Sequence, residues 1–293
     1  MNQRETLTPP VPQRQRKLPR FRLVTVKRTL ALTPRMLRIT LTGDDWEGFQ
    51  PSGPADSLKV TFPAPGHSAP ILPTTAPNGP VYAEGEQVQP RRAYTIRRWD
   101  AVARELELDF LLHGHGPGGL WAAQANPGDR LIIGEPRMSY RPDPTASAFI
   151  LAGDEAALPA IATILEALPT TARATVYAEV ESRADELPLP APERSTVVWL
   201  HRTGTGLEPS RLLERTLKAL PAPAASMRIW LACEAAAMRE IRKHLIHLGV
   251  ERTSLSTQGY WKYGAGNYSD HDFGLDVEGA ASGGAPQRQP VGQ

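Results

Sequence analysis

Residues 148–168, AFILAGDEAALPAIATILEAL, indicate the kind of fold in the second half of the chain. Residues 148–151 form a short apolar run, which is typical of a buried strand, and the run is followed by Gly153-Asp154-Glu155. Pro159 stands where the first turn of a helix tolerates proline. Apolar residues then recur at steps of three and four, at Leu158, Ile161, Leu165 and Leu168. The segment therefore predicts a strand that turns into an amphipathic helix.

The same alternation continues downstream. Further strands are expected at residues 174–180, 196–201 and 227–232. One helix is expected to carry Leu212, Thr216 and Leu220 on one side, and another, ending at Gly249, carries Met238, Ile241, Leu245 and Leu248. Strands and helices in alternation predict a parallel sheet with helices on both faces.

The first half has the rhythm of short strands separated by Gly and Pro. Runs 21–27 and 36–41 flank the turn at Thr33-Pro34, and 57–62 is a third run. Runs 92–98 and 105–112 are interpreted as a hairpin, and 130–133 is a sixth strand. We expect a six-stranded antiparallel β-barrel, because closure removes exposed edges. The expected divisions are tails at 1–19 and 267–293, a barrel domain at 20–143 and an α/β domain at 144–266.

Composition excludes several classes of protein. With 293 residues, 41% of them hydrophobic, the chain can bury a core of about two domains. The single cysteine, Cys233, excludes an intramolecular disulfide and an iron–sulfur cluster, so any electron transfer requires a borrowed cofactor. The net charge of +2 does not predict nucleic-acid binding. Because no apolar stretch is long enough for membrane insertion or for a secretion signal, we expect a cytoplasmic protein.

The stretch Arg92-Ala93-Tyr94-Thr95-Ile96-Arg97 carries side chains suited to a phosphorylated ring system. On a strand, Arg92 and Tyr94 share one face, and Thr95 lies on the other with Arg97. Arginine pairs with phosphate, tyrosine stacks on a ring, and threonine hydrogen-bonds a ring nitrogen. A plain strand with solvated arginines is the alternative.

Residues 113–121, HGHGPGGLW, lead from a strand into a short helix. A glycine-rich turn before a helix can present backbone N–H groups to a phosphate. A hairpin loop and a metal pair at His113 and His115 are the alternatives, and the metal pair is disfavoured because no third ligand is near.

Asp154 and Glu155 follow a strand where a parallel sheet binds a dinucleotide, although a G-x-G-x-x-G fingerprint is absent. Cys233-Glu234 ends a later strand at the same sheet edge, and a buried apolar role is favoured for Cys233 over a catalytic thiol. The aromatics of residues 259–263 are interpreted as packing or as the lining of a site. His271 is interpreted as a solvated side chain, and no metal site is expected.

In this order, the motifs resemble those of the siderophore-interacting protein family, flavin-dependent ferric-siderophore reductases related to ferredoxin–NADP reductases. The resemblance rests on Arg-Arg-Ala-Tyr-Thr-Ile-Arg at 91–97, the His-Gly-x-Gly-Pro segment with Trp121-Ala122, Pro127-Gly128-Asp129, Gly153-Asp154-Glu155 with Leu158-Pro159-Ala160-Ile161, and Gly-Tyr-Trp at 259–261. The chain departs from the family at Gly118-Gly119, where many relatives carry Ala-Ser, and at Cys233, where a glycine is common.

The resemblance implies a role for each matching residue. Arg92 would face phosphate or ribityl oxygens of FAD, Tyr94 would stack on the isoalloxazine, and Thr95 would hydrogen-bond near its reactive nitrogen. The remaining expected cofactor contacts are Asp109, His113, Gly116, Gly118, Gly119, Trp121, Asp154 and Glu155. Lys59, Arg137 and Lys262 would receive an anionic ferric siderophore.

The expected activity is therefore that of an oxidoreductase that reduces chelated Fe(III) to Fe(II) with electrons from NADPH, NADH or a reduced ferredoxin. No catalytic side chain is obligatory, because the flavin carries the chemistry. The protein is expected to be a monomer. Two other functions stay open at this point: a generic NAD(P)H-dependent flavin or quinone reductase, and a siderophore-binding protein without activity.

Overall fold

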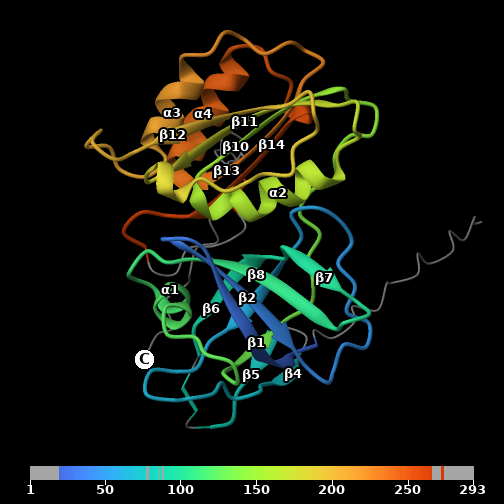
Figure 1. Cartoon of the computed structure of the whole chain (residues 1–293), viewed down its shortest axis with the longest axis vertical. Helices are drawn as coiled ribbons and strands as arrows, with labels where there is room; N and C mark the ends of the chain where they lie inside the picture. The colour runs from blue at the N-terminus through green and yellow to red at the C-terminus, as the bar shows by residue number, and fades with distance from the viewer. Residues whose placement is uncertain (1–19, 77–78, 85, 88, 266–271, 274–293) are drawn as a thin grey trace, which may run out of the picture.

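The computed structural model describes residues 20–76, 79–84, 86–87, 89–265 and 272–273 (Figure 1). The expected tail at 1–19, most of the expected tail at 267–293, and His271 lie outside the described residues. No helix in the described part is long and apolar enough to cross a bilayer.

The N-terminal half is a curled antiparallel sheet of seven strands. Its spatial order is β6-β3-β9-β1-β2-β8-β7. The strands are β1 (Arg22–Thr33), β2 (Met36–Thr42), β3 (Ser57–Thr61), β6 (Arg91–Thr95), β7 (Arg98–Asp100), β8 (Glu105–Leu111) and β9 (Arg130–Ile133). Edge strands β6 and β7 do not pair with each other, so the sheet is barrel-like but open. The expectation of six strands in a closed barrel is wrong on both counts.

The expected hairpin of 92–98 with 105–112 is confirmed only at its closed end, where β7 pairs with β8 from Arg98 onward. The run 92–98 splits, because β6 pairs with β3 whereas β7 pairs with β8. Between them, the N–H of Ile96 donates to the Asp56 carbonyl at 2.8 Å, and that of Arg97 donates to the Glu107 carbonyl at 2.9 Å. These two hydrogen bonds hold the short segment in which the chain passes from edge strand β6 to edge strand β7. A separate two-stranded sheet, β4 (Thr74–Ala76) with β5 (Gly79–Val81), lies in the Pro/Gly-rich stretch.

The C-terminal half is a parallel five-stranded sheet of order β12-β11-β10-β13-β14. Its strands are β10 (Ala148–Gly153), β11 (Arg173–Val180), β12 (Thr196–His201), β13 (Arg228–Glu234) and β14 (Leu255–Trp261). Helix α2 (Leu158–Ala167) lies between this sheet and the N-terminal sheet, and α3 (Arg211–Lys218) and α4 (Ala235–His247) cover the other face (Figure 1). The predicted parallel sheet with helices on both faces is confirmed; the predicted strands omitted β14.

Helix α3 buries a different stripe from the one expected. Leu213 and Leu217 are 0% and 5% exposed, whereas Leu212 and Thr216 are half-buried. Two leucines four residues apart bury more apolar area than a stripe that includes a threonine, so the helix turns them toward the core. Leu220 lies beyond the end of α3.

The two sheets are joined through α2 and through the connector that follows β9. The backbone N–H of Ala55 donates to Thr163 Oγ1 on α2 at 2.9 Å, and Arg97 pairs with Glu166 of the same helix at 2.8 Å. Arg35 pairs with Glu181 after β11 at 2.8 Å. These contacts hold the N-terminal half against α2 and the loop after β11.

Candidate functional site

The register of β3 with β6 decides which way the expected flavin strand presents its side chains. Tyr94 stands opposite Leu58 and Arg92 opposite Val60, and both partners belong to the buried core. Thr95 stands opposite Ser57, on the outward face that meets the C-terminal half. The predicted division of β6 into two chemically different faces is thus present.

Two of the expected substrate cations share the outward face with Thr95. Lys59 lies two residues from Ser57 on β3, and Arg137 forms an isolated antiparallel bridge with Ser57. Directly paired residues point to the same side, as do residues two apart on one strand, so Lys59 and Arg137 lie on one face. Lys262 is exposed and directly follows β14.

The strand β14 reaches the same place from the other half of the molecule. Burial raises the pKa of the Tyr260 phenol, and the nearby Thr95 side chain lowers it. Lys262 is two residues further along the chain. Thr95, Lys59 and Arg137 therefore share one face of the N-terminal sheet, and the nearness of Lys262 to them stays a prediction.

Tyr94 and Arg92 are held by the barrel side of β6. The Tyr94 ring centroid lies 4.3 Å from that of Phe110, and burial raises the pKa of its phenol. Arg92 Nη1 donates to the Arg91 carbonyl at 2.7 Å, and burial lowers the pKa of the Arg92 guanidinium. Stacking of Tyr94 on a flavin and pairing of Arg92 with phosphate stay predictions.

The glycine-rich loop has the shape of a phosphate cradle. Gly114 and Gly116 adopt left-handed φ values of 75° and 72°, which favour glycine. The loop leads into α1 (Pro117–Ala122), whose first turn leaves the N–H groups of buried Gly118 and Gly119 without intrahelical acceptors. These orphan donors suit a pyrophosphate, so the loop fits the FAD expected from the sequence.

Close packing explains why the loop needs glycine at its two later positions. A Cβ on Gly118 would lie 2.0 Å from the Tyr94 hydroxyl, and one on Gly119 would lie 3.1 Å from the Leu111 carbonyl oxygen. A serine at 119 would crowd this contact.

His113 and Trp121 line the same loop. The His113 ring centroid is 4.2 Å from that of His115, and burial, followed by the charge of His115, lowers the pKa of His113. Trp121 packs against Phe62 and Phe110, with ring centroids 5.7 and 6.0 Å apart. Both residues border the cradle, and their contact with a cofactor stays a prediction.

Asp109 is already engaged within the chain. Arg38 donates to its two carboxylate oxygens at 2.7 and 2.8 Å, in a bidentate pair. Asp109 is 7% exposed. In the described structure it fixes β8 to β2, and its expected role toward the adenylate side stays a prediction.

Asp154 lies at the topological switch point, where the strand order reverses between β10 and β13. Its Oδ2 accepts hydrogen bonds from Ser210 Oγ at 2.7 Å, Trp261 Nε1 at 2.8 Å and the Glu234 N–H at 3.1 Å. Burial, and then the charge of Glu155, raises the pKa of Asp154 to about 7. The residue is therefore a buried, proton-sensitive junction between β10, α3 and β14.

Glu155 belongs to a buried ionic network. Arg202, after β12, pairs with Glu155 at 2.7 Å, Glu179 at 3.0 Å and Glu181 at 2.9 Å. Glu179 also accepts the N–H groups of Ser210 and Leu213 at 2.6 and 2.7 Å. The carboxylates of Asp154 and Glu155 are thus bound by the chain itself, and their contact with a dinucleotide stays a prediction.

Cys233 is 0% exposed at the end of β13, and burial raises the pKa of its thiol well above the usual value. A thiol that stays protonated is a poor nucleophile, which agrees with the apolar role favoured from the sequence. No group of three potential metal-ligating side chains occurs among the described residues.

Sequence reasoning missed three parts of this site: the Tyr260–Thr95 contact, Arg202, and Ser210 with its left-handed φ of 69°. The Gly259-Tyr260-Trp261 motif was the one sequence feature that pointed to the Tyr260–Thr95 contact. Arg202 and Ser210 lie in a loop, and the sequence around them does not indicate which acidic side chains they contact.

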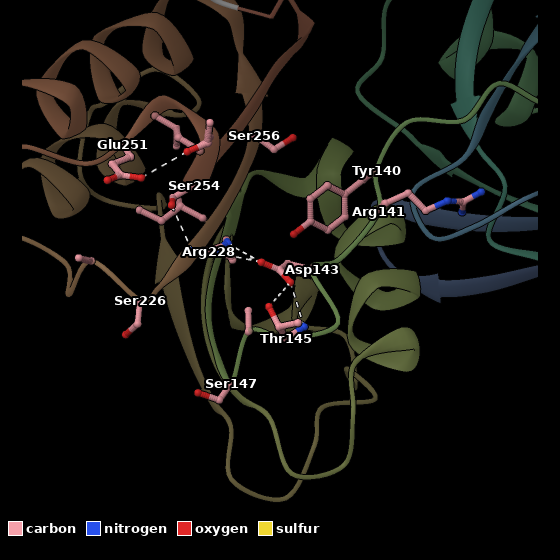
Figure 2. Close-up of a pocket in the computed structure, with 15 residues that line it drawn as sticks. Tyr140, Arg141, Asp143, Thr145, Ser147, Ser226, Arg228, Glu251, Ser254 and Ser256 are labelled. Atoms are coloured by element: carbon pink, nitrogen blue, oxygen red, sulfur yellow. Dashed lines mark hydrogen bonds and ion pairs between the residues drawn. The ribbon is translucent and has the colours of Figure 1, made fainter.

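A separate cavity of about 640 Å³ lies at the amino ends of β10, β13 and β14, away from the switch point (Figure 2). Arg228 Nη2 pairs with Asp143 at 2.8 Å, and Arg228 Nη1 donates to Ser254 Oγ at 3.2 Å. Burial raises the pKa of Tyr140, on the connector, to about 12. None of the expected site residues lines this cavity.

Comparison with known proteins identifies the two halves. The model of the siderophore-interacting FAD-binding domain matches residues 25–140, and that of the siderophore-interacting protein matches residues 146–264. The ferric vibriobactin reductase ViuB of Vibrio cholerae is 33% identical over 258 residues, which cover 86% of this chain and 93% of ViuB. An NADPH-dependent ferric-chelate reductase of Escherichia coli is 29% identical and covers 87% of this chain, with 98% of its own length aligned.

Solved structures agree with these sequence matches. A siderophore utilization protein from T. fusca superposes with a TM-score of 0.77 at 37% identity, covering 86% of this chain and 97% of that protein. The siderophore-interacting protein SipS of Aeromonas hydrophila gives 0.70 at 30% identity, with coverage of 84% and 93%. Phthalate dioxygenase reductase, 13% identical with a TM-score of 0.55 over 82% of this chain and 68% of its own, shares the fold. This chain belongs to the siderophore-interacting protein family.

Proposed function

We propose that the protein is an FAD-dependent ferric-siderophore reductase, which reduces chelated Fe(III) to Fe(II) and thereby releases iron. The observation that carries this proposal is the β3–β6 register, which places Thr95 on the face that also carries Lys59 and Arg137. The names of the relatives from V. cholerae and E. coli support the same substrate class.

Different residues of the chain would hold different parts of FAD. The N–H groups of Gly118 and Gly119 would hold the pyrophosphate, and Arg92 and Tyr94 would hold the ribityl and ring portions. Bound FAD supplies the coupling of a two-electron donor to one-electron transfer. The Thr95 hydroxyl would orient the ring edge nearest the interface.

The substrate would be drawn to the same edge by charge. Lys59, Arg137 and Lys262 supply cationic side chains that raise the local concentration of an anionic ferric chelate. One electron converts one Fe(III) to Fe(II), which the hard oxygen ligands of a siderophore hold more weakly. No proton donor or nucleophile on the protein is required for this transfer.

The proposal also includes the electron donor, the cellular location and the oligomeric state. NADPH, the donor in the name of the E. coli relative, or NADH would reach the flavin from the parallel sheet, and a reduced ferredoxin is the other candidate. The protein would act as a monomer in the cytoplasm.

An anaerobic titration tests the proposal. The purified protein is reconstituted with FAD, the flavin absorbance is followed with NADPH, NADH and reduced ferredoxin in turn, and a ferric siderophore is then added. Bleaching by one donor and recovery on addition of the chelate are expected. A protein that cannot bind FAD overturns the proposal, and faster turnover on free flavin than on ferric siderophores would instead indicate a generic flavin reductase.

A further inference from the structure

Lys262, which directly follows β14, stands between two residues that the parallel sheet holds by hydrogen bonds. On one side, Trp261 Nε1 donates to Asp154 Oδ2 at 2.8 Å. On the other side, the backbone N–H of Tyr263 donates to Glu234 Oε1 at 3.3 Å. The chain is therefore fastened before and after Lys262, to the carboxyl ends of β10 and β13.

Both acceptors are buried and are themselves held in place. Asp154 is 1% exposed and Glu234 is 3% exposed. Glu234 Oε2 accepts the N–H groups of Ala236 and Ala237 at 2.8 and 2.9 Å, so the same side chain caps the N-terminus of α4. Asp154 Oδ2 also accepts a hydrogen bond from Ser210 Oγ at 2.7 Å. Buried networks that are bonded in this way are rigid, so the two carboxylates are fixed points.

The fixed points lie where the regular pairing of the sheet ends. Cys233 pairs with Gly259, whereas the next residue, Glu234, pairs with Trp261, so β14 contains a β-bulge at its end. A bulge disrupts the ladder locally and re-aims side chains. Since β14 ends at Trp261, Lys262 lies beyond the ladder, and the carboxylates hold the chain there in its place.

A fixed backbone matters for a lysine that meets a ligand. Lys262 is exposed. A lysine on a mobile segment loses both backbone and side-chain freedom when it orders on a ligand, whereas a lysine on a fixed backbone loses only that of its side chain. Fastening the chain on both sides therefore lowers the entropic cost of an ion pair made by Lys262.

We propose that Asp154 and Glu234 are positioning residues, which fix the backbone on both sides of Lys262 and so present its ammonium to an anionic ferric siderophore. This inference rests on the proposed function, because it requires Lys262 to receive the substrate. It gives two buried carboxylates of the parallel sheet a part in substrate affinity, although neither touches the substrate.

Two variants each remove one of the fixed points. Trp261→Phe keeps an aromatic ring but has no N–H for Asp154. Glu234→Gln keeps one oxygen that can cap α4, and its NH2 group cannot accept the N–H of Tyr263. Neither variant alters the side chain of Lys262.

The measurement is steady-state reduction of an anionic ferric tris-catecholate by the full-length protein reconstituted with FAD. In each variant KM is expected to rise about fivefold, the worth of one net hydrogen bond, while kcat changes by less than about twofold. A rise in KM at constant kcat is the signature of lost binding, whereas general damage to the fold lowers kcat as well.

Two further variants separate positioning from an effect elsewhere. In a Lys262→Ala background, whose own KM should be raised, adding Trp261→Phe should raise KM no further, because the side chain that is positioned is gone. Trp199→Phe is the matched control, because it makes the same exchange on β12, at the opposite edge of the sheet from β14, and it should leave KM unchanged.

Each outcome decides the matter. An unchanged KM in Trp261→Phe overturns the role of Asp154, and an unchanged KM in Glu234→Gln overturns that of Glu234. A rise that persists undiminished in the Lys262→Ala background overturns the inference as a whole. If the unmodified protein binds FAD but does not reduce the ferric chelate, the proposed function itself fails, which is a result distinct from the others.

Discussion

At the scale of single residues, Asp154 is unusual because its carboxylate is surrounded by hydrogen-bond donors. Trp261 Nε1, Ser210 Oγ and the Glu234 N–H meet one oxygen, and the Ala156 N–H meets the other at 3.1 Å. These bonds favour the carboxylate, yet complete burial and the charge of Glu155 outweigh them and raise the pKa to about 7.

The raised pKa of Asp154 predicts a pH-dependent stability. Between about pH 4, where the unfolded chain ionises this group, and about pH 7, the folded protein binds one more proton than the unfolded chain. The free energy of unfolding contributed by Asp154 is therefore lost as the pH rises through this window, by up to about 1.4 kcal/mol per pH unit. Urea denaturation of the protein and of Asp154→Asn should show their difference shrinking from pH 4 to pH 7.

Asp143→Asn is the control for this experiment. Hydrogen bonds from Thr145, and then Arg228, lower the pKa of Asp143, the opposite direction to that of Asp154. Its removal should leave the slope between pH 4 and pH 7 unchanged. Parallel curves for the protein and Asp154→Asn would contradict the prediction.

Gly118 has no side chain, and this lets the glycine-rich loop pack closely against Tyr94. Gly118→Ala would place a Cβ 2.0 Å from the Tyr94 hydroxyl and 3.2 Å from the Phe62 ring, so a packed tyrosine must move. We expect a loss of about 1–3 kcal/mol in unfolding free energy, as overpacking costs, and FAD binding weakened tenfold or more.

Gly134→Ala serves as its control, because the nearest atom to an added Cβ there is the Lys59 carbonyl oxygen at 3.8 Å. Denaturation and fluorescence titration with FAD measure both variants. If Gly118→Ala and Gly134→Ala bind FAD with equal affinity, the loop does not depend on glycine at 118.

At the scale of elements, α3 shows how packing selects one face of a short helix. Leu213 is fully buried among the residues that fill the space under α4, including Met238 and Ile241, whereas Leu212 is half-buried. The helix begins after Ser210, whose N–H and Oγ are held by Glu179 and Asp154. These bonds, and not periodicity alone, set its rotation.

This orientation predicts unequal costs for two adjacent leucines. Leu213→Ala should lower the unfolding free energy by about 2–5 kcal/mol, because it leaves a cavity in a closed core. Leu212→Ala, the matched change one residue earlier, should cost clearly less. Chemical denaturation of both variants checks the order, and the reverse order would restore the stripe expected from the sequence.

At the scale of the whole molecule, the expected substrate cations come from both halves of the chain. Lys59 and Arg137 come from the N-terminal side, and Lys262 comes from the end of β14. The net charge of only +2 gives no sign of such a group of cations, which stays a prediction.

Charge reversal at Lys59 and Lys262 should impair the proposed reductase through its substrate. The double variant Lys59→Glu/Lys262→Glu is expected to raise KM for an anionic ferric siderophore about tenfold or more and to weaken its dependence on ionic strength. Reduction of FAD by the electron donor should not slow to the same extent. Lys243→Glu, at an exposed position of α4, is the control, and an equal loss in that variant would argue against a local substrate site.

The class of fold was predictable from the sequence, because hydrophobic periodicity and the Gly/Pro punctuation are local properties. Motifs whose residues are adjacent in the chain also marked the expected flavin strand and the glycine loop. The pairing of β6 with β3, the open sheet and the burial of Leu213 on α3 emerged only from the three-dimensional structure. That structure alone brought Tyr260 to Thr95, and Arg202 to Glu155 and Glu179. Such pairs are separated by many residues, and the free energy that selects them comes from burial and charge pairing between distant segments, which no local pattern records.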